Sequence, residues 1–322
     1  MNALAKPVSK LPDVGTTIFT VMSALASEQG ALNLSQGFPD FDGPESLLQA
    51  VNEHMRSGQN QYPPMAGVAA LREAIAEKVL DLYGLACDAD TEITVTAGAT
   101  EALFCAIAAV VHAGDEVIVL DPAYDSYDPV IRLQGAVPVH VSLMAPAYRI
   151  DWDRIEAAIT ANTRLLILNS PHNPTGMVMD ESDIAALSAL CAKYDIYLIG
   201  DEVYEHMVFD QAKHLSLCGY AELYARSFVI SSFGKTYHVT GWKVGYCVAP
   251  PALTKELRRL HQYVTFTVNT PVQLGIADFL QQHPEHHQQL PAFYQAKRDL
   301  FCELLQGSRF TVVPSPVSYS HL

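Results

Sequence analysis

Lys235 is the residue in this sequence that most clearly offers chemistry. It follows an apolar run in the stretch SSFGKTYHVTGWKVGY, residues 231–246, with Phe233 and Tyr237 close by. Such neighbours exclude water, and desolvation lowers the pKa of an amine and makes it a nucleophile for an aldehyde, giving a Schiff base. The letters GKT do not mark a phosphate-binding loop, because that motif needs a glycine where Val229 stands. The alternative is a surface lysine at the end of a strand.

Schiff-base chemistry on a pyridine aldehyde requires partners around the lysine. The ring nitrogen needs a carboxylate, the phenolic oxygen needs hydrogen-bond donors, and the ring needs an aromatic face. Asp201 in GDEVY, Asn173 in NPTG, Tyr204 and Tyr124 are candidates for these three roles. Each also has an ordinary structural interpretation, such as a helix cap for Asp201 or a turn before proline for Asn173. Their joint occurrence favours a site.

The same chemistry needs an anion site for a phosphate group. In TAGATEALF, the residues Gly98, Ala99 and Thr100 open an apolar helix, whose unpaired N–H groups and dipole attract an anion. Ser232 and Lys243 could add a hydroxyl group and a positive charge. The sequence therefore contains candidates for every part of such a site.

These residues need a scaffold, and the sequence predicts an α/β fold with a mostly parallel sheet covered by helices. Short runs rich in Val, Ile and Leu are typical of buried strands, and segments of helical periodicity lie between them. The expected strands are residues 116–122, 164–171, 196–202, 227–235 and 244–250, and the expected helices are residues 44–58, 67–84, 99–114 and 180–195.

Polar side chains follow the expected strands. Ligands of open α/β sheets bind beyond the carboxyl ends of the strands, so we expect these side chains to converge on one site. They are Asp121, Tyr124, Asn169, Asn173, Asp201, Tyr204, Ser232 and Lys235.

A second, smaller domain is expected from the two ends of the chain, which at 322 residues is longer than a usual single domain. From about residue 252 the pattern is long helices, with no further buried strand before residues 309–316. We expect residues 1–43 to be an N-terminal segment of the small domain and residues 44–280 to be the large domain. Residues 281–322 would start the C-terminal part of the small domain.

Composition favours small-molecule chemistry. The formal net charge is −15, which disfavours a nucleic-acid or anionic-membrane surface, because phosphate binding needs clustered Lys and Arg. The sequence has neither the apolar core of a signal peptide nor an apolar run long enough to span a bilayer, so we expect a cytoplasmic protein. No metal site is expected, because the six cysteines include no Cys-x-x-Cys pair and HPEHH, residues 283–287, suits a solvated helix connection.

The motifs NPTG, GDEVY and SSFGKTYHVTGWKVGY resemble those of the class I and II pyridoxal-phosphate aminotransferases of fold type I. Near the N-terminus, LNLSQGFPDFDGPESL and NQYPPMAGVAALREAIA are most similar to the branch that contains bacterial methionine aminotransferase and the kynurenine and glutamine aminotransferases. The resemblance runs from about Thr17 to Pro314. It implies a large domain, a smaller domain and pyridoxal 5'-phosphate as the cofactor.

The resemblance implies a role for each matching residue. Lys235 would form the Schiff base and shuttle a proton, and Asp201 would hold the proton of the pyridine nitrogen. Tyr204 and Asn173 would hydrogen-bond the phenolic oxygen, and Tyr124 would stack on the ring.

The resemblance also implies a phosphate site shared between two subunits. Tyr62 would reach it from a second subunit, so a homodimer is the expected active form. Lys243 stands where many family members carry arginine, and it offers a point charge rather than a bidentate fork. The phosphate-binding residues of the same chain would be Gly98, Ala99, Thr100, Ser232 and Lys243.

The expected reaction moves an amino group from a neutral amino acid to a 2-oxo acid. Within the family, aspartate-preferring members carry an arginine shortly before an Asn-x-Pro sequence, whereas the matching window here, residues 263–269, contains no basic residue. Methionine and aromatic, glutamine-like or kynurenine-like donors are therefore favoured. The expected substrate contacts are Gly37 and Phe38 in SQGFPDF, together with Asn173.

Two alternatives remain open. The first is a pyridoxal-phosphate-dependent cysteine-conjugate β-lyase, because its reaction begins with the same proton abstraction. The second rests on the end of the sequence, where family members continue with an aromatic strand and the arginine that binds the substrate α-carboxylate, whereas this sequence reads VSYSHL. This second alternative is a truncated, non-catalytic chain that lacks the arginine.

Overall fold

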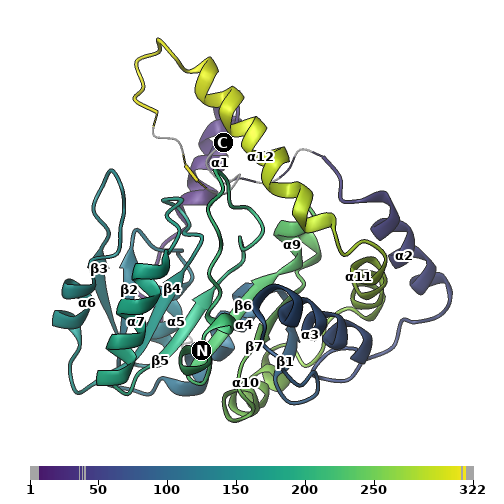
Figure 1. The fold of residues 1–322 in the computed structure, drawn as a ribbon, viewed down its shortest axis with the longest axis horizontal. Helices are drawn as coiled ribbons and strands as arrows, with labels where there is room; N and C mark the ends of the chain where they lie inside the picture. The colour runs from purple at the N-terminus through teal and green to yellow at the C-terminus, as the bar shows by residue number, and fades with distance from the viewer. Residues whose placement is uncertain (1–6, 36, 38, 40, 313–314, 317–322) are drawn as a thin grey trace, which may run out of the picture.

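The computed structural model describes residues 7–35, 37, 39, 41–312 and 315–316, and its centre is a seven-stranded sheet (Figure 1). The strands are β1 (Ile93–Thr96), β2 (Glu116–Asp121), β3 (Val137–Ser142), β4 (Thr163–Asn169), β5 (Tyr197–Asp201), β6 (Ser227–Ser232) and β7 (Gly245–Val248). They lie in the order β1-β7-β6-β5-β4-β2-β3. The pairs from β3 to β6 are parallel, whereas β7 runs antiparallel to both β6 and β1.

Helices surround this sheet (Figure 1). In the described part of the chain the α-helices are α1 (Ile18–Glu28), α2 (Glu45–Arg56), α3 (Ala69–Tyr83), α4 (Gly98–Val110), α5 (Tyr127–Leu133), α6 (Trp152–Ala158), α7 (Glu181–Lys193), α8 (Ala221–Tyr224), α9 (Phe233–Thr236), α10 (Pro251–Val264), α11 (Thr270–Gln282) and α12 (His286–Leu304).

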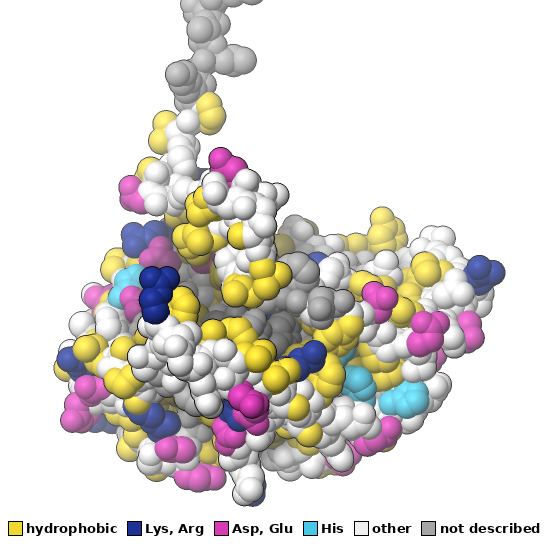
Figure 2. Space-filling view, turned by 90° about the horizontal axis from the view of Figure 1, so that it is seen from above, with side chains coloured by type: hydrophobic (Ala, Val, Ile, Leu, Met, Phe, Trp, Pro, Cys, Tyr) yellow, Lys and Arg dark blue, Asp and Glu magenta, His cyan; other side chains and the backbone are white. Residues whose placement is uncertain are grey.

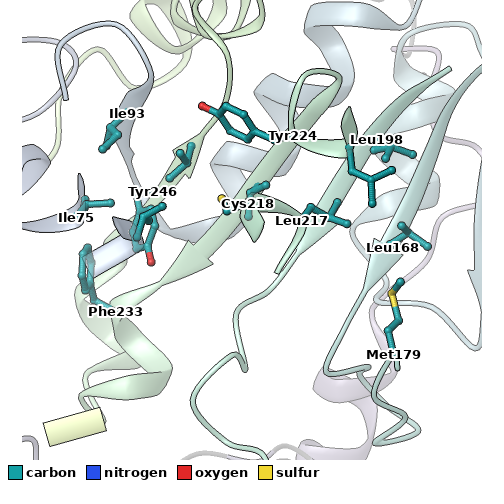
Figure 3. Packing of buried hydrophobic residues seen from close by; sticks show 14 of the residues in the cluster. Ile75, Ile93, Leu168, Met179, Leu198, Leu217, Cys218, Tyr224, Phe233 and Tyr246 are labelled. Carbon is teal, nitrogen blue, oxygen red and sulfur yellow. The ribbon is translucent and has the colours of Figure 1, made fainter. Parts of the chain in front are cut away.

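Successive side chains of each strand point to opposite faces of the sheet, and both faces carry an apolar layer. Ile118 of β2 belongs to a cluster with α3 and α7, whereas the next residue, Val119, belongs to a cluster with α4, α5 and α10. Figure 3 shows part of the first cluster, in which Ile75 of α3 lies near Ile93 of β1 and Tyr246 of β7. The sheet is therefore covered on both sides, as a mostly parallel sheet requires.

The register of the parallel strands brings their carboxyl ends to one edge. Asn169, the last residue of β4, pairs with Asp201, the last residue of β5, and Asp201 pairs with Ile230 near the end of β6. Side chains that follow these strands therefore start from the same level of the sheet.

The five predicted strands and the four predicted helices are present within about four residues of their expected bounds. Two strands were not predicted from the sequence: β1, which is buried but only four residues long, and the edge strand β3, most of whose residues are exposed or partly buried. The strand expected at 309–316 was wrong for the residues described there, 309–312 and 315–316, which are irregular. No described strand lies beside this segment to supply a ladder of hydrogen bonds.

The surface fits the acidic composition. Acidic and basic side chains are interspersed on the face shown in Figure 2, with hydrophobic side chains between them. Among the described residues, no helix is both long and apolar enough to cross a membrane.

Gly275 tests the packing of α11 on α2. A methyl group on Gly275 would lie 2.5 Å from Val51 Cγ2 and 2.9 Å from Val51 N. We expect Gly275→Ala to lower the free energy of unfolding by about 1–2 kcal/mol, because overpacking against backbone outweighs the roughly 1 kcal/mol gain in helix propensity. Urea unfolding measures the change. Gly15→Ala is the control, since a methyl group on Gly15 meets no atom within 4 Å. Equal stability of the two variants would contradict the packing argument.

Candidate active site

Lys235 lies on the short helix α9, directly after β6. Ser232 caps this helix, since its Oγ accepts the N–H of Gly234 at 3.2 Å. The Lys235 ammonium lies 5.3 Å from the centre of the Tyr204 ring. Burial lowers the pKa of the Lys235 amine, and the negative charge of Asp201 opposes that change in part. The amine is therefore closer to its nucleophilic form than an exposed lysine is.

Asp201 is the buried carboxylate at the end of β5. Tyr127 Oη donates a hydrogen bond to its Oδ2 at 2.6 Å, and the N–H of Val203 donates to its Oδ1 at 3.4 Å. Burial raises the pKa of Asp201 to about 6, while the Tyr127 hydrogen bond and the charge of Lys235 act in the opposite direction. Asp201 is thus held mostly ionised near neutral pH inside an apolar surrounding.

Two asparagines connect the loop after β4 to the end of β5. Asn169 Nδ2 donates to the backbone carbonyl of Asp201 at 2.8 Å, and the N–H of Asn173 donates to Asn169 Oδ1 at 2.7 Å. Tyr204, three residues after Asp201, is buried. Asn173 and Tyr204 therefore lie in the two loops that flank Asp201.

Residues predicted to bind an anion lie close together at the start of α4. A methyl group on Gly98 would lie 3.2 Å from Lys243 Nζ, so the ammonium stands beside the helix N-terminus. A methyl group on Gly245 would lie 2.7 Å from Ala99 N, which shows how closely β7 approaches the same turn. Thr100 Oγ1 lies 3.5 Å from Tyr124 Oη. The helix end, a cation and one of the candidate aromatic rings are thereby brought together.

Some predicted residues are not part of this group. Tyr62 is 82% exposed, and its ring packs against Phe266 with 5.5 Å between ring centres. Asp121 makes an ion pair with His140 at 3.0 Å. Gly37 is described, and Phe38 lies outside the described residues.

The histidines of HPEHH are less solvated than expected. The His286 ring lies 5.3 Å from the ring centres of both Tyr237 and Phe279, and burial lowers the pKa of His286. Aromatic partners that are distant in the sequence account for this difference. Among the described residues, no three His, Cys, Asp or Glu side chains lie together in a group that could hold a metal ion.

The sequence reading missed Tyr127 and Glu205. Glu205 is buried and accepts hydrogen bonds from Lys78 Nζ at 2.6 Å, Ser231 Oγ at 2.5 Å and Tyr246 Oη at 3.1 Å. Although burial acts to raise it, the pKa of Glu205 is held well below its ordinary value by the charge of Lys78 and these hydrogen bonds. The acidic residues of GDEVYE were a signal for Glu205, but its partners lie on distant elements.

A cleft of about 950 Å³ lies beside this group of residues. Pro174 and Thr175 line it on the side of the Asn173 loop, and Arg149, Lys213 and Pro316 line it elsewhere. Neither Lys235 nor Asp201 is among its lining residues, so the cleft adjoins the candidate site without containing its chemistry.

The grouped side chains form a recognisable chemical set. They combine an amine of lowered pKa, a buried carboxylate, two tyrosine rings and a helix N-terminus with an ammonium beside it. Such a set fits a pyridine aldehyde that carries a phosphate group, because each part of that molecule meets the group it needs.

Comparison with known proteins gives a consistent family. The sequence model described as "Aminotransferase class I and II" matches residues 29–321. Methionine aminotransferase from Escherichia coli is 54% identical over 313 residues, which are 97% of this chain and 81% of that protein. Kynurenine–oxoglutarate transaminase 3 from Homo sapiens is 33% identical over 92% of this chain and 70% of that protein.

Solved structures agree. The crystal structure of an Escherichia coli protein with a methionine aminotransferase function has a TM-score of 0.95 and covers 98% of this chain and 82% of that one. A double mutant of Thermus thermophilus aspartate aminotransferase has a TM-score of 0.90 at 31% identity, covering 98% of this chain and 84% of that one.

The raised pKa of Asp201 predicts a stability cost near neutral pH. The folded protein binds more protons than the unfolded chain between the ordinary aspartate pKa of 3.8 and about 6. Stability therefore falls as pH rises through that window, by roughly 3 kcal/mol in all. We expect Asp201→Asn, which cannot ionise, to raise the free energy of unfolding of the cofactor-free protein at neutral pH by about 1–3 kcal/mol, and to change it little near pH 4.

Urea unfolding of both proteins between about pH 4 and 8 measures this difference. The control is Asp81→Asn, at an exposed position, for which a nearly constant difference is expected. A variant that is less stable than the parent at neutral pH would contradict the assigned cost of burying the Asp201 charge.

Proposed function

The chain belongs to the class I and II aminotransferases, and from this membership we propose that it binds pyridoxal 5'-phosphate and transfers the amino group of a neutral amino acid to a 2-oxo acid. The observation that carries the proposal is the placement of Lys235 in a partly buried position beside Tyr204 and under the electrostatic influence of Asp201.

In this proposal each residue acts on one part of the reaction. When bound, the cofactor supplies a ring that accepts electrons as the substrate Cα–H bond breaks. Lys235 would hold the cofactor through its amine and would serve as the base for the substrate Cα proton. Asp201 would pair with the protonated ring nitrogen, and Tyr127, which donates a hydrogen bond to Asp201, would orient that carboxylate. The low dielectric around Asp201 strengthens that interaction.

The remaining residues would position the cofactor. Asn173 and Tyr204 would hydrogen-bond its phenolic oxygen, and Tyr124 would stack on its ring. The start of α4 would hold the phosphate, because the helix dipole and the adjacent Lys243 favour a dianion there. The same-chain groups in this phosphate site are Gly98, Ala99, Thr100, Ser232 and Lys243.

A neutral amino acid is the proposed donor. Residues 263–269 contain no Lys or Arg that could pair with a second carboxylate. Instead Tyr263 is 85% exposed and Phe266 lies against Tyr62, so the segment presents aromatic surface. The similarity to methionine aminotransferase from Escherichia coli supports methionine among the donors. Gly37, Phe38 and Asn173 remain the proposed substrate contacts.

The proposed active form is a homodimer. Tyr62, Tyr263, Val264 and Phe266 are exposed together, and α1 has no buried residue although it carries several apolar side chains. Apolar surface of this kind is typical of an interface with a second chain. In the dimer Tyr62 would serve the phosphate site of the other subunit.

A two-domain arrangement is also proposed, with the boundaries 1–43, 44–280 and 281–322. Its support is the contact between the N-terminal segment and α12, where the Phe41 and Phe293 ring centres are 5.5 Å apart. Lys297 Nζ lies 5.7 Å from the centre of the Phe41 ring. In this proposal the first and last segments pack as one small unit.

Lys235→Ala tests the proposal. We expect the parent protein to develop a visible absorption band with pyridoxal 5'-phosphate, which methionine removes, and the variant to lack it. Loss of the proton-transfer group should slow turnover by at least roughly 10²–10⁴-fold. Lys255→Ala, at an exposed position on α10, should behave as the parent. A band of equal strength in Lys235→Ala would show that another residue holds the cofactor.

Substrate charge gives a second test. We expect kcat/KM for methionine to exceed that for aspartate by on the order of a hundredfold, since an unpaired carboxylate is costly to desolvate. Asparagine and aspartate match in size and differ in charge, so they provide the control. We expect kcat/KM for asparagine to exceed that for aspartate. Initial rates with one 2-oxo acid acceptor measure both pairs. Faster use of aspartate than of methionine would refute the neutral-donor assignment.

A further inference from the structure

A buried histidine links the anion site at the start of α4 to the loop that carries Tyr62. His261, on α10, is fully buried. Its Nδ1 lies 2.5 Å from Oε1 of Glu101, in the first turn of α4, and its Nε2 lies 2.9 Å from the carbonyl oxygen of Met65. Glu101 also accepts the N–H of Ala97, the residue that precedes the helix.

Hydrogen-bond accounting makes the His261–Glu101 pair uncharged as a whole. A carbonyl oxygen only accepts, so Nε2 of His261 carries a proton and donates it to Met65. One further proton lies between Nδ1 and the Glu101 carboxyl group, which gives either an ion pair or two neutral groups. The net charge is zero in both cases. Glu101 therefore adds no net charge that would repel an anion at the start of α4.

The backbone of His261 positions Phe266, the aromatic residue that packs against Tyr62. The His261 carbonyl oxygen accepts the N–H groups of Thr265 at 3.0 Å and Phe266 at 2.9 Å where α10 ends. These bonds hold Phe266 at φ 70°, and its ring packs edge-on against Tyr62. The His261 side chain thus holds Met65, which lies three residues beyond Tyr62. The His261 carbonyl group holds Phe266, whose ring contacts Tyr62.

We infer that His261 is a positioning residue that sets the place of Tyr62 relative to the anion site of its own subunit. The inference rests on the proposed function, in which Tyr62 completes the phosphate site of a second copy of this chain. One buried side chain then connects the two phosphate sites of the dimer, because it contacts the helix that forms one site and the loop that completes the other.

A double-mutant cycle tests the inference through the dissociation constant of pyridoxal 5'-phosphate, followed by absorbance. Tyr62→Phe should weaken binding about tenfold, since one hydrogen bond to a charged phosphate is lost. His261→Gln, whose amide cannot hold both partners, should weaken it roughly threefold to tenfold. In the Tyr62→Phe background His261→Gln should have less than about a twofold effect, because a positioning residue acts through Tyr62.

His214→Gln is the matched control. His214 is another buried histidine bonded to a glutamate, since its Nε2 lies 2.9 Å from Oε2 of Glu202. We expect this variant to leave the dissociation constant within about twofold of the parent, although it removes a contact of the same kind. A loss equal to that of His261→Gln would mean that any buried histidine–glutamate pair supports binding through stability alone, and would overturn the inference.

The cycle separates the inference from the proposed function. An unchanged dissociation constant in Tyr62→Phe would refute the role of Tyr62 and, with it, the inference. If Tyr62→Phe weakens binding and His261→Gln has the same effect in both backgrounds, only the inference fails. Restoration of binding by adding Glu101→Gln to His261→Gln would assign the effect to charge and also overturn it.

A second pair of variants covers the case in which His261→Gln does not fold. Glu101→Gln keeps a hydrogen-bonding group opposite Nδ1 of a neutral His261, so binding should stay within about twofold of the parent. Glu101→Leu removes that group and should reproduce the threefold to tenfold loss, again only when Tyr62 is intact. Equal binding by the two Glu101 variants would contradict the inference.

Discussion

The burial of the Asp201 charge is the constraint on which the site depends. A carboxylate can stay ionised away from water only if donors and positive charge surround it. The sheet supplies this by its register, which ends β4 and β5 at the same level, and by placing Lys235 after β6. Tyr127 adds a donor from α5. The parallel strands therefore determine which donors and charges surround Asp201.

Glu205 shows how the same fold treats a carboxylate that has a structural role. Four residues after Asp201, it accepts hydrogen bonds from α3, β6 and β7 and its pKa is well below the ordinary value. Asp201 keeps a raised pKa with Tyr127 and a longer bond from Val203. The two carboxylates therefore differ: Glu205 accepts several short hydrogen bonds from the protein, whereas a raised pKa of the kind that Asp201 has is typical of functional sites.

The central strands were easier to predict from the sequence than the edge of the sheet. Buried strands were predicted because they are continuous apolar runs followed by polar residues, and the motif residues lie at the ends of those runs. The edge strand β3, with its exposed and prolyl positions, lacks that signal. The Lys78–Glu205 pair and the His261–Glu101 pair join residues separated by 127 and 160 positions, so no local pattern indicated them. The burial of His286 depends on distant aromatic rings in the same way.

The opposed pKa directions of Lys235 and Asp201 explain why such a site should be stabilised by its ligand. Burial lowers the pKa of the amine and raises that of the carboxylate, so both charged forms are disfavoured relative to water. A ligand that binds the amine and offers a protonated ring nitrogen to the carboxylate removes both penalties at once. Because such a ligand binds the folded state alone, its binding free energy adds to stability. Burial of the two groups lowers the free energy of unfolding of the ligand-free protein. A ligand that interacts with both groups relieves this cost, and the relief contributes to its affinity.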